Sequence, residues 1–186
     1  MRCFVAIELP KEVQERLGRL QKALAAAGGG VKWVEPGHIH LTLKFLGEVG
    51  DGQVSAVCEA VKQTAARHGP FELQVGQAGC FPQRGAARVL WVGLVEPPPT
   101  LIACQEDLEL TLGELGFAME ARAFHPHLTL GRVKDPRVGH DMRRQIEPHA
   151  RFDAGSFQAD ALVVFQSVLQ RSGPIYTPLA HCALTG

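Results

Sequence analysis

The stretch HIHLTLKFLG at residues 38–47 places two histidines and a threonine on alternate positions, with isoleucine or leucine between them. The chain nearly repeats this stretch at residues 125–134, which read HPHLTLGRVK. His127 follows His40 by 87 residues in a chain of 186. Two copies indicate a duplication of one structural unit, because solenoids need at least three stacked repeats to bury a continuous core.

The segments around each copy alternate strand-like and helix-like patterns. We predict strands at residues 3–9, 31–34, 71–81, 88–95, 152–169 and 176–184, besides the two motif segments. Apolar spacing of three and four predicts helices at 11–27, at 51–67 with Asp51 as N-cap, at 97–117 and near 139–147. This order predicts two comparable halves, which we treat as two lobes of a single domain over residues 1–186, each carrying one motif.

Alternation along a strand sorts the motif residues onto two faces. In the first copy, one face takes His38, His40, Thr42 and Lys44, and the other takes Ile39, Leu41, Leu43 and Phe45. In the second copy, His125, His127 and Thr129 share the polar face. The same parity turns Arg132 away from these residues unless Gly131 introduces a bulge or ends the strand.

Two imidazoles facing each other can act as general acid and general base at the same time. Hydroxyl groups of Thr42 and Thr129 can donate hydrogen bonds to phosphate oxygens. This combination suits an in-line displacement at phosphorus, in which one side deprotonates the nucleophile and the other protonates the departing oxygen. Such a site needs neither a covalent intermediate nor a metal.

The two segments His40-Leu41-Thr42-Leu43 and His127-Leu128-Thr129-Leu130 resemble the paired H-x-T-x motifs of the two-histidine (2H) phosphoesterase superfamily. Flanking features extend this similarity over essentially the whole chain: RCFVAIELP near the start, Trp33 before the first motif, KFLGE after it, Arg132 after the second, and GPIYTPL near the end. Together they resemble the bacterial and archaeal RNA 2′,3′-cyclic phosphodiesterases, also called the 2′-5′ RNA ligase family.

The resemblance implies a bilobal α+β fold, with two pseudo-symmetric lobes whose antiparallel sheets line a central cleft and with helices outside. It implies hydrolysis of RNA terminal 2′,3′-cyclic phosphate to 2′-phosphate without a cofactor, and in some members 2′-5′ RNA ligase activity. The implied partners are RNA 3′ ends, such as tRNA fragments, or small cyclic nucleotides. His40 would then protonate the leaving 3′ oxygen, His127 would activate water, and Thr42, Thr129 and Arg132 would bind the substrate.

Two alternatives stay open at this stage. Four histidines on the polar faces, His38, His40, His125 and His127, could bind a metal and form a metal-dependent hydrolase. A non-catalytic module that binds RNA ends or nucleotides would also keep the motifs. Three aromatic residues, Phe4, Phe45 and Tyr176, could stack on a base, although core packing is the commoner role of a single aromatic. Lys44 is expected at the rim of the site.

Composition restricts the partners and the compartment. The chain has 19 Lys and Arg against 19 Asp and Glu, which disfavours a long electrostatic footprint on nucleic acid. Its five scattered cysteines lack a C-x-x-C pair and are expected to be buried thiols in a reduced cytoplasm. No segment reaches the length needed to span a membrane. We therefore expect a cytoplasmic monomer.

Overall fold

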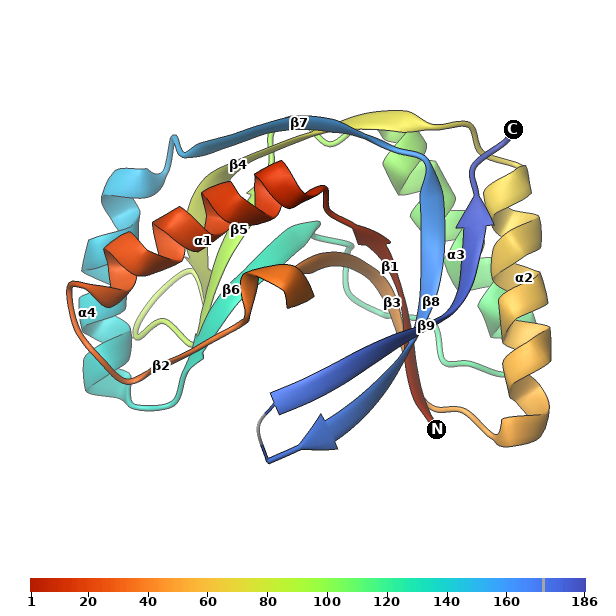
Figure 1. The fold of residues 1–186 in the computed structure, drawn as a ribbon, viewed down its shortest axis with the longest axis horizontal. Helices are drawn as coiled ribbons and strands as arrows, with labels where there is room; N and C mark the ends of the chain where they lie inside the picture. The colour runs from red at the N-terminus through yellow and green to blue at the C-terminus, as the bar shows by residue number, and fades with distance from the viewer. Residues whose placement is uncertain (172) are drawn as a thin grey trace.

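The computed structural model describes residues 1–171 and 173–186, and its strands form two antiparallel sheets (Figure 1). Sheet A contains, in spatial order, β3 (His40–Glu48), β1 (Arg2–Glu8), β8 (Ala161–Gln170) and β9 (Gly173–Ala183). Sheet B contains β2 (Val31–Trp33), β6 (His127–Val133), β5 (Val89–Leu94), β4 (Phe71–Phe81) and β7 (Asp153–Ala159). The predicted α+β class and the antiparallel pairing are confirmed.

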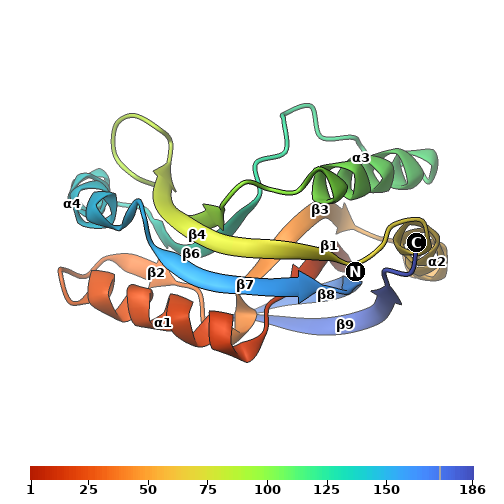
Figure 2. The same ribbon diagram turned by 90° about the horizontal axis from the view of Figure 1, so that it is seen from above.

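Helices cover one face of each sheet (Figures 1 and 2). On sheet A, α2 (Val54–Ala66) contacts β8 and β9, and α3 (Pro99–Glu114) contacts β3. On sheet B, α1 (Lys11–Ala25) contacts β7, and α4 (Pro136–Ile146) contacts β4 and β6. Three short 3-10 turns complete the chain: η1 (Pro36–His38), η2 (Asp51–Gln53) and η3 (Glu147–His149). We call the opposite face of each sheet its open face. Within the described residues, no helix combines the length and apolarity required to cross a membrane.

The helix boundaries depart from the predicted ones where proline or a turn decides the start. Asp51 does not cap α2; it begins η2, and α2 follows Gln53 with no side-chain cap. The last helix begins three residues earlier than predicted, at Pro136. There the Asp135 side chain accepts a hydrogen bond from the Arg137 backbone N–H at 2.8 Å, and proline suits the first helical turn because it has no N–H to leave unpaired.

The two sheets do not correspond to the two halves of the sequence. Sheet A joins β1 and β3 from the beginning of the chain to β8 and β9 from its end, whereas sheet B joins β2 and β4 to β5, β6 and β7. Each sheet nevertheless carries one motif, on β3 and on β6. These two strands also contact each other although they belong to different sheets. The halves are therefore interwoven through strand pairing.

Both motif strands carry a bulge at the same place, three residues after the histidine. In sheet A, Ala6 pairs with Thr42 and Val5 pairs with Lys44, so that Leu43 is an extra residue. In sheet B, Trp91 pairs with Thr129 and Leu90 with Gly131, so that Leu130 is extra. An extra residue reverses the in–out alternation beyond it.

The first bulge overturns the expected position of Lys44. Lys44 is buried on the helix side of sheet A, 4% exposed, and its Nζ donates to Glu109 on α3 and to the Ala118 carbonyl oxygen at 2.8 Å. Phe45 instead lies on the open face, 72% exposed, with its ring 6.1 Å from that of Phe4. Glu109 also accepts from the Glu120 backbone N–H at 3.1 Å. The Lys44 side chain thus links β3 by hydrogen bonds to α3 and to the segment that leads into the second motif.

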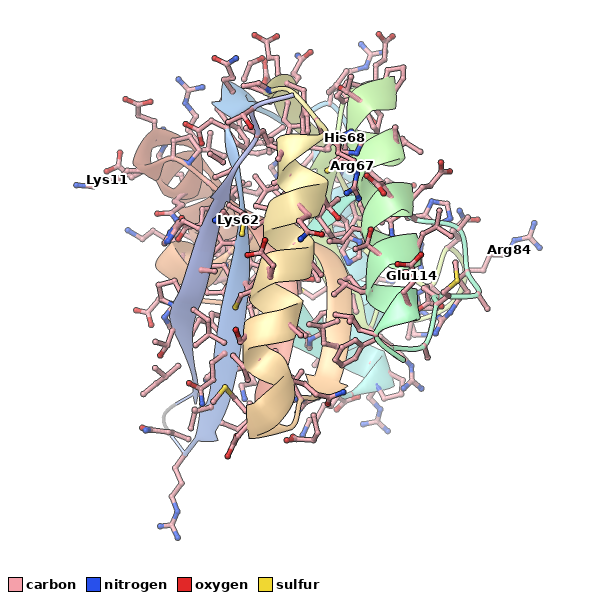
Figure 3. The ribbon with its side chains drawn as sticks, turned by 90° about the vertical axis from the view of Figure 1, so that its right-hand side faces the viewer. Lys11, Lys62, Arg67, His68, Arg84 and Glu114 are labelled. Atoms are coloured by element: carbon pink, nitrogen blue, oxygen red, sulfur yellow. The ribbon has the colours of Figure 1, made fainter. Side chains whose placement is uncertain are left out.

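Replacing Lys44 with methionine should lower the free energy of unfolding by about 3–5 kcal/mol, because the Glu109 carboxylate would stay buried without its cation. Urea unfolding followed by circular dichroism measures this difference. Lys62→Met is the matched control, since Lys62 is exposed on α2, on the side shown in Figure 3, and should change stability by no more than about 0.5 kcal/mol. Equal stabilities for the two variants would contradict the buried ion pair.

Candidate functional site

Each motif histidine makes the same hydrogen bond to the backbone. The Nδ1 atom of His40 lies 2.8 Å from the His38 carbonyl oxygen, and the Nδ1 atom of His127 lies 2.7 Å from the His125 carbonyl oxygen. A carbonyl oxygen only accepts, so Nδ1 must carry the proton in both rings. In the neutral rings, the Nε2 atoms are therefore left as acceptors for chemistry.

This arrangement corrects the expected role of the outer histidines. His38 lies in η1 and His125 precedes β6, so neither shares a strand face with the inner histidine. What each contributes to its motif is a backbone carbonyl, which any residue type can supply. Within the described ranges, no three His, Cys, Asp or Glu side chains come together in a way that could hold a metal ion. The four-histidine metal site is therefore not favoured.

The ring of His40 is partly buried and is surrounded by aromatic side chains. Its ring stacks on Phe4 with centroids 4.7 Å apart, and the edge of Tyr176 approaches it at 5.3 Å. Phe4 packs in turn against Phe165, at 5.2 Å. Burial lowers the pKa of His40 below its usual value of 6.5, although the hydrogen bond to the His38 carbonyl opposes this shift. Free His40 is consequently neutral at pH 7.

The surroundings of His127 use different residues, which the motif analysis did not identify. Phe81 of β4 meets the His127 ring edge-on with centroids 5.2 Å apart, and Trp91 of β5 lies 5.1 Å from Phe81. A Cβ atom at Gly79 would come within 2.6 Å of the Trp91 ring, so glycine is what makes room for the indole. The signal for these residues lies in strand pairing, since Trp91 pairs with Thr129, and pairing is invisible in the sequence.

The predicted phosphate-binding residues lie on the open faces. Thr42 and Thr129 are half-buried and follow their histidines by two positions, as the alternation predicts. The bulge at Leu130 returns Arg132 to the same face as Thr129, which removes the conflict that parity alone creates. Burial raises the pKa of Tyr176, and the positive charge of Arg132 opposes that rise, so the guanidinium of β6 lies near the phenol of β9.

Two buried glutamines hold the bulges and were not anticipated. Gln21 of α1 donates from Nε2 to the Leu130 carbonyl oxygen at 2.9 Å. Gln105 of α3 donates from Nε2 to the Leu43 carbonyl oxygen at 3.4 Å. Each helix therefore reaches from its own half to the bulged residue of the other motif. The Leu130 carbonyl oxygen also accepts from the Val34 backbone N–H at 2.9 Å, so Gln21 adds a second hydrogen bond to an oxygen that already has a backbone partner.

Comparison with known proteins agrees with this duplicated arrangement. The family described as "LigT like Phosphoesterase" matches the chain twice, over residues 7–91 and over residues 92–176. Each match contains one of the two motifs. The chain belongs to the LigT-like phosphoesterase family, within the 2H superfamily.

Relatives in the family span the full chain. An RNA 2′,3′-cyclic phosphodiesterase of Methanothermobacter thermautotrophicus is 36% identical over 179 residues, covering 96% of each chain. One of Thermotoga maritima is 32% identical and covers all of this chain and 97% of its own. The structure of Escherichia coli LigT complexed with 3′-AMP superposes with a TM-score of 0.76 at 29% identity, covering 100% of this chain and 98% of its own.

The histidine geometry predicts the protonation of both rings. Nitrogen-15 NMR of the imidazoles should show the Nδ1–H tautomer for neutral His40 and neutral His127, because both Nδ1 atoms face carbonyl oxygens. A pH titration of the same spectra should place the pKa of His40 below 6.5. Single His→Gln variants assign the resonances. An Nε2–H tautomer at either position would contradict the proposed orientation.

Proposed function

We propose that this protein opens RNA terminal 2′,3′-cyclic phosphates to 2′-phosphates, with His40 and His127 as the acid–base pair. The observation that carries this proposal is the matched pair of imidazoles, each with Nδ1 held by a carbonyl and Nε2 left free, in strands that contact each other. The relatives named RNA 2′,3′-cyclic phosphodiesterase support the substrate class. The joining of a cyclic end to a 5′-hydroxyl is the reverse-type reaction of the same site.

The mechanism is a single in-line displacement. His127 Nε2 takes a proton from water, whose oxygen forms a bond to phosphorus. The bond between phosphorus and O3′ breaks, and His40 Nε2 gives its proton to O3′. The products are a 2′-phosphate and a free 3′-hydroxyl. The step transfers no group to the protein and changes no oxidation state.

The negative charge of the bound phosphate lets His40 take up the proton that it must donate. Burial lowers the pKa of His40 and keeps its imidazole neutral in the free protein, whereas a general acid must enter the step protonated. An anionic phosphate next to the ring favours the charged form and raises the pKa again. Substrate binding therefore favours the protonated form of His40. The hydroxyls of Thr42 and Thr129 and the guanidinium of Arg132 hold the non-bridging oxygens and the developing charge.

The same reasoning covers the remaining expectations. We propose that the protein acts as a monomer, since both motifs and their supporting glutamines come from one chain. We also propose a single domain, because the largest buried cluster takes side chains from both halves. A cytoplasmic location fits the five free thiols, four of which are buried.

Replacing His40 or His127 by alanine should lower turnover of a nucleoside 2′,3′-cyclic phosphate by about 10²- to 10⁴-fold, the usual contribution of one acid–base group. Chromatography that separates 2′- from 3′-nucleotides measures both the rate and the product. Circular dichroism checks that the variants stay folded. Near wild-type rates in both variants would refute the mechanism, as would a 3′-phosphate product.

A sulfur-substituted substrate separates the acid from the base. When O3′ of the cyclic phosphate is replaced by sulfur, the thiolate leaves without a proton, because a thiol has a pKa of about 8.5. With this substrate, His40→Ala should lose roughly tenfold or less, whereas His127→Ala should keep its loss of about 10²- to 10⁴-fold. The opposite pattern would reverse the two roles and leave the reaction unchanged.

Exhaustive treatment with EDTA should leave the rate unchanged, since the proposed step uses only side chains. The pH profile of kcat/KM should be bell-shaped, because one imidazole must be neutral and the other charged. Loss of activity on chelation, with recovery on adding zinc, would favour the metal-dependent alternative instead.

A further inference from the structure

A hollow of about 350 Å³ lies directly beside His40, between the end of β1, the turn η1, the start of α1 and the open face of β8 and β9. Its lining includes Glu8, Gln14, His38, His40, Phe165 and Tyr176. The mechanism proposed above uses only His40 among these residues. Most of the hollow therefore has no role in that mechanism.

We propose that this hollow binds the base of the nucleoside that carries the cyclic phosphate, and that it prefers guanine. The inference rests on the proposed function: if His40 protonates O3′, the ribose must lie on the His40 side of the phosphorus atom. The base attached to that ribose then falls within reach of the hollow that His40 borders.

The walls of the hollow suit the flat face of a base. Tyr176 is half-buried and held by ring contacts to Phe4 at 5.2 Å, His38 at 5.3 Å and His40 at 5.3 Å. Phe165 forms the adjoining floor and is 7% exposed. A ring fixed in this way offers stacking surface with little further loss of side-chain freedom.

The charge of the hollow favours a base over a phosphate. Apart from its two histidines, the only ionisable acidic or basic residue in the lining is Glu8, whose carboxylate would repel a phosphate group. Glu8 Oε2 lies 3.3 Å from His181 Nε2, which steadies the carboxylate. Arg132, the cation suited to phosphate, is outside this lining.

Guanine is the base that best complements Glu8. A carboxylate only accepts hydrogen bonds, and it can accept two at once. Guanine presents two neighbouring donors on its Watson–Crick edge, N1–H and the exocyclic amino group. Uracil presents a single N–H between two carbonyl oxygens, which face the carboxylate unfavourably. Bases of single-stranded RNA ends are commonly recognised on this edge and by stacking on aromatic rings.

The test compares kcat and KM for the 2′,3′-cyclic phosphates of guanosine, adenosine, cytidine and uridine with those for ribose 2′,3′-cyclic phosphate, which has no base. The wild-type protein should favour guanosine over uridine by about tenfold or more in kcat/KM, the scale of a hydrogen bond to a charged group. The baseless substrate should be about tenfold or more weaker than guanosine, mainly through KM.

Variants assign the preference to individual groups. Glu8→Gln should abolish the preference for guanosine by lowering kcat/KM for guanosine and should not lower kcat/KM for uridine, whose carbonyl oxygens no longer face a carboxylate. Tyr176→Ser should raise KM for the four nucleosides by a larger factor than for the baseless substrate, which reports any effect through the His40 ring that Tyr176 contacts, and Tyr176→Phe, which keeps the ring, should resemble the wild type. Glu114→Gln is the matched control for the charge change, since Glu114 is exposed on α3, on the outer side shown in Figure 3.

The outcomes separate this inference from the proposed function. If no cyclic phosphate is opened, the proposed function fails. If all five substrates are opened with equal kcat/KM, the reaction stands and the base site is refuted. A preference for guanosine that survives Glu8→Gln would refute the role of Glu8.

Discussion

One extra residue directly after each motif threonine is the constraint on which the site depends. Leu43 and Leu130 interrupt the alternation of their strands, and each places the residue two positions later on the open face. Their carbonyl oxygens accept hydrogen bonds from the side chains of Gln105 and Gln21. The Leu130 oxygen accepts a second bond, from the Val34 backbone N–H at 2.9 Å. Each half therefore supports the irregular point in the other.

The bulges also make the two sides of the site chemically unequal. At the position where β6 carries Arg132, β3 carries Phe45, because both follow the bulged residue by two. One side thus gains a cation and the other an exposed ring. The His40 ring stacks on Phe4 and is desolvated, whereas the His127 ring contacts Phe81 only in an edge-on arrangement. The duplicated sequence therefore forms a site with two chemically different sides, as a reaction with distinct entering and leaving groups requires.

The sequence predicted the parts of this architecture that depend on local pattern. Apolar spacing located the helices and strands, and repetition identified His40, Thr42, His127 and Thr129. Three features could not be predicted from the sequence because they depend on contacts with residues that are distant in the chain. Strand pairing decides the bulge that buries Lys44, the carbonyl geometry decides what His38 contributes, and neighbouring strands bring Phe81 and Trp91 to His127. The position of Arg132 on the open face depends on the bulge at Leu130, which strand parity does not predict and which the glycine at 131 only suggested.

The interwoven sheets have a consequence for how the protein comes to be made. The first motif is synthesised early, on β3, but sheet A is complete only when β8 and β9 have been added beside β1. Chains are synthesised at roughly 5–20 residues per second, and units fold as their sequence becomes available. The sheet around His40 therefore waits for β8 and β9, which leave the ribosome long after β3. An interrupted chain cannot assemble the complete sheet around that histidine.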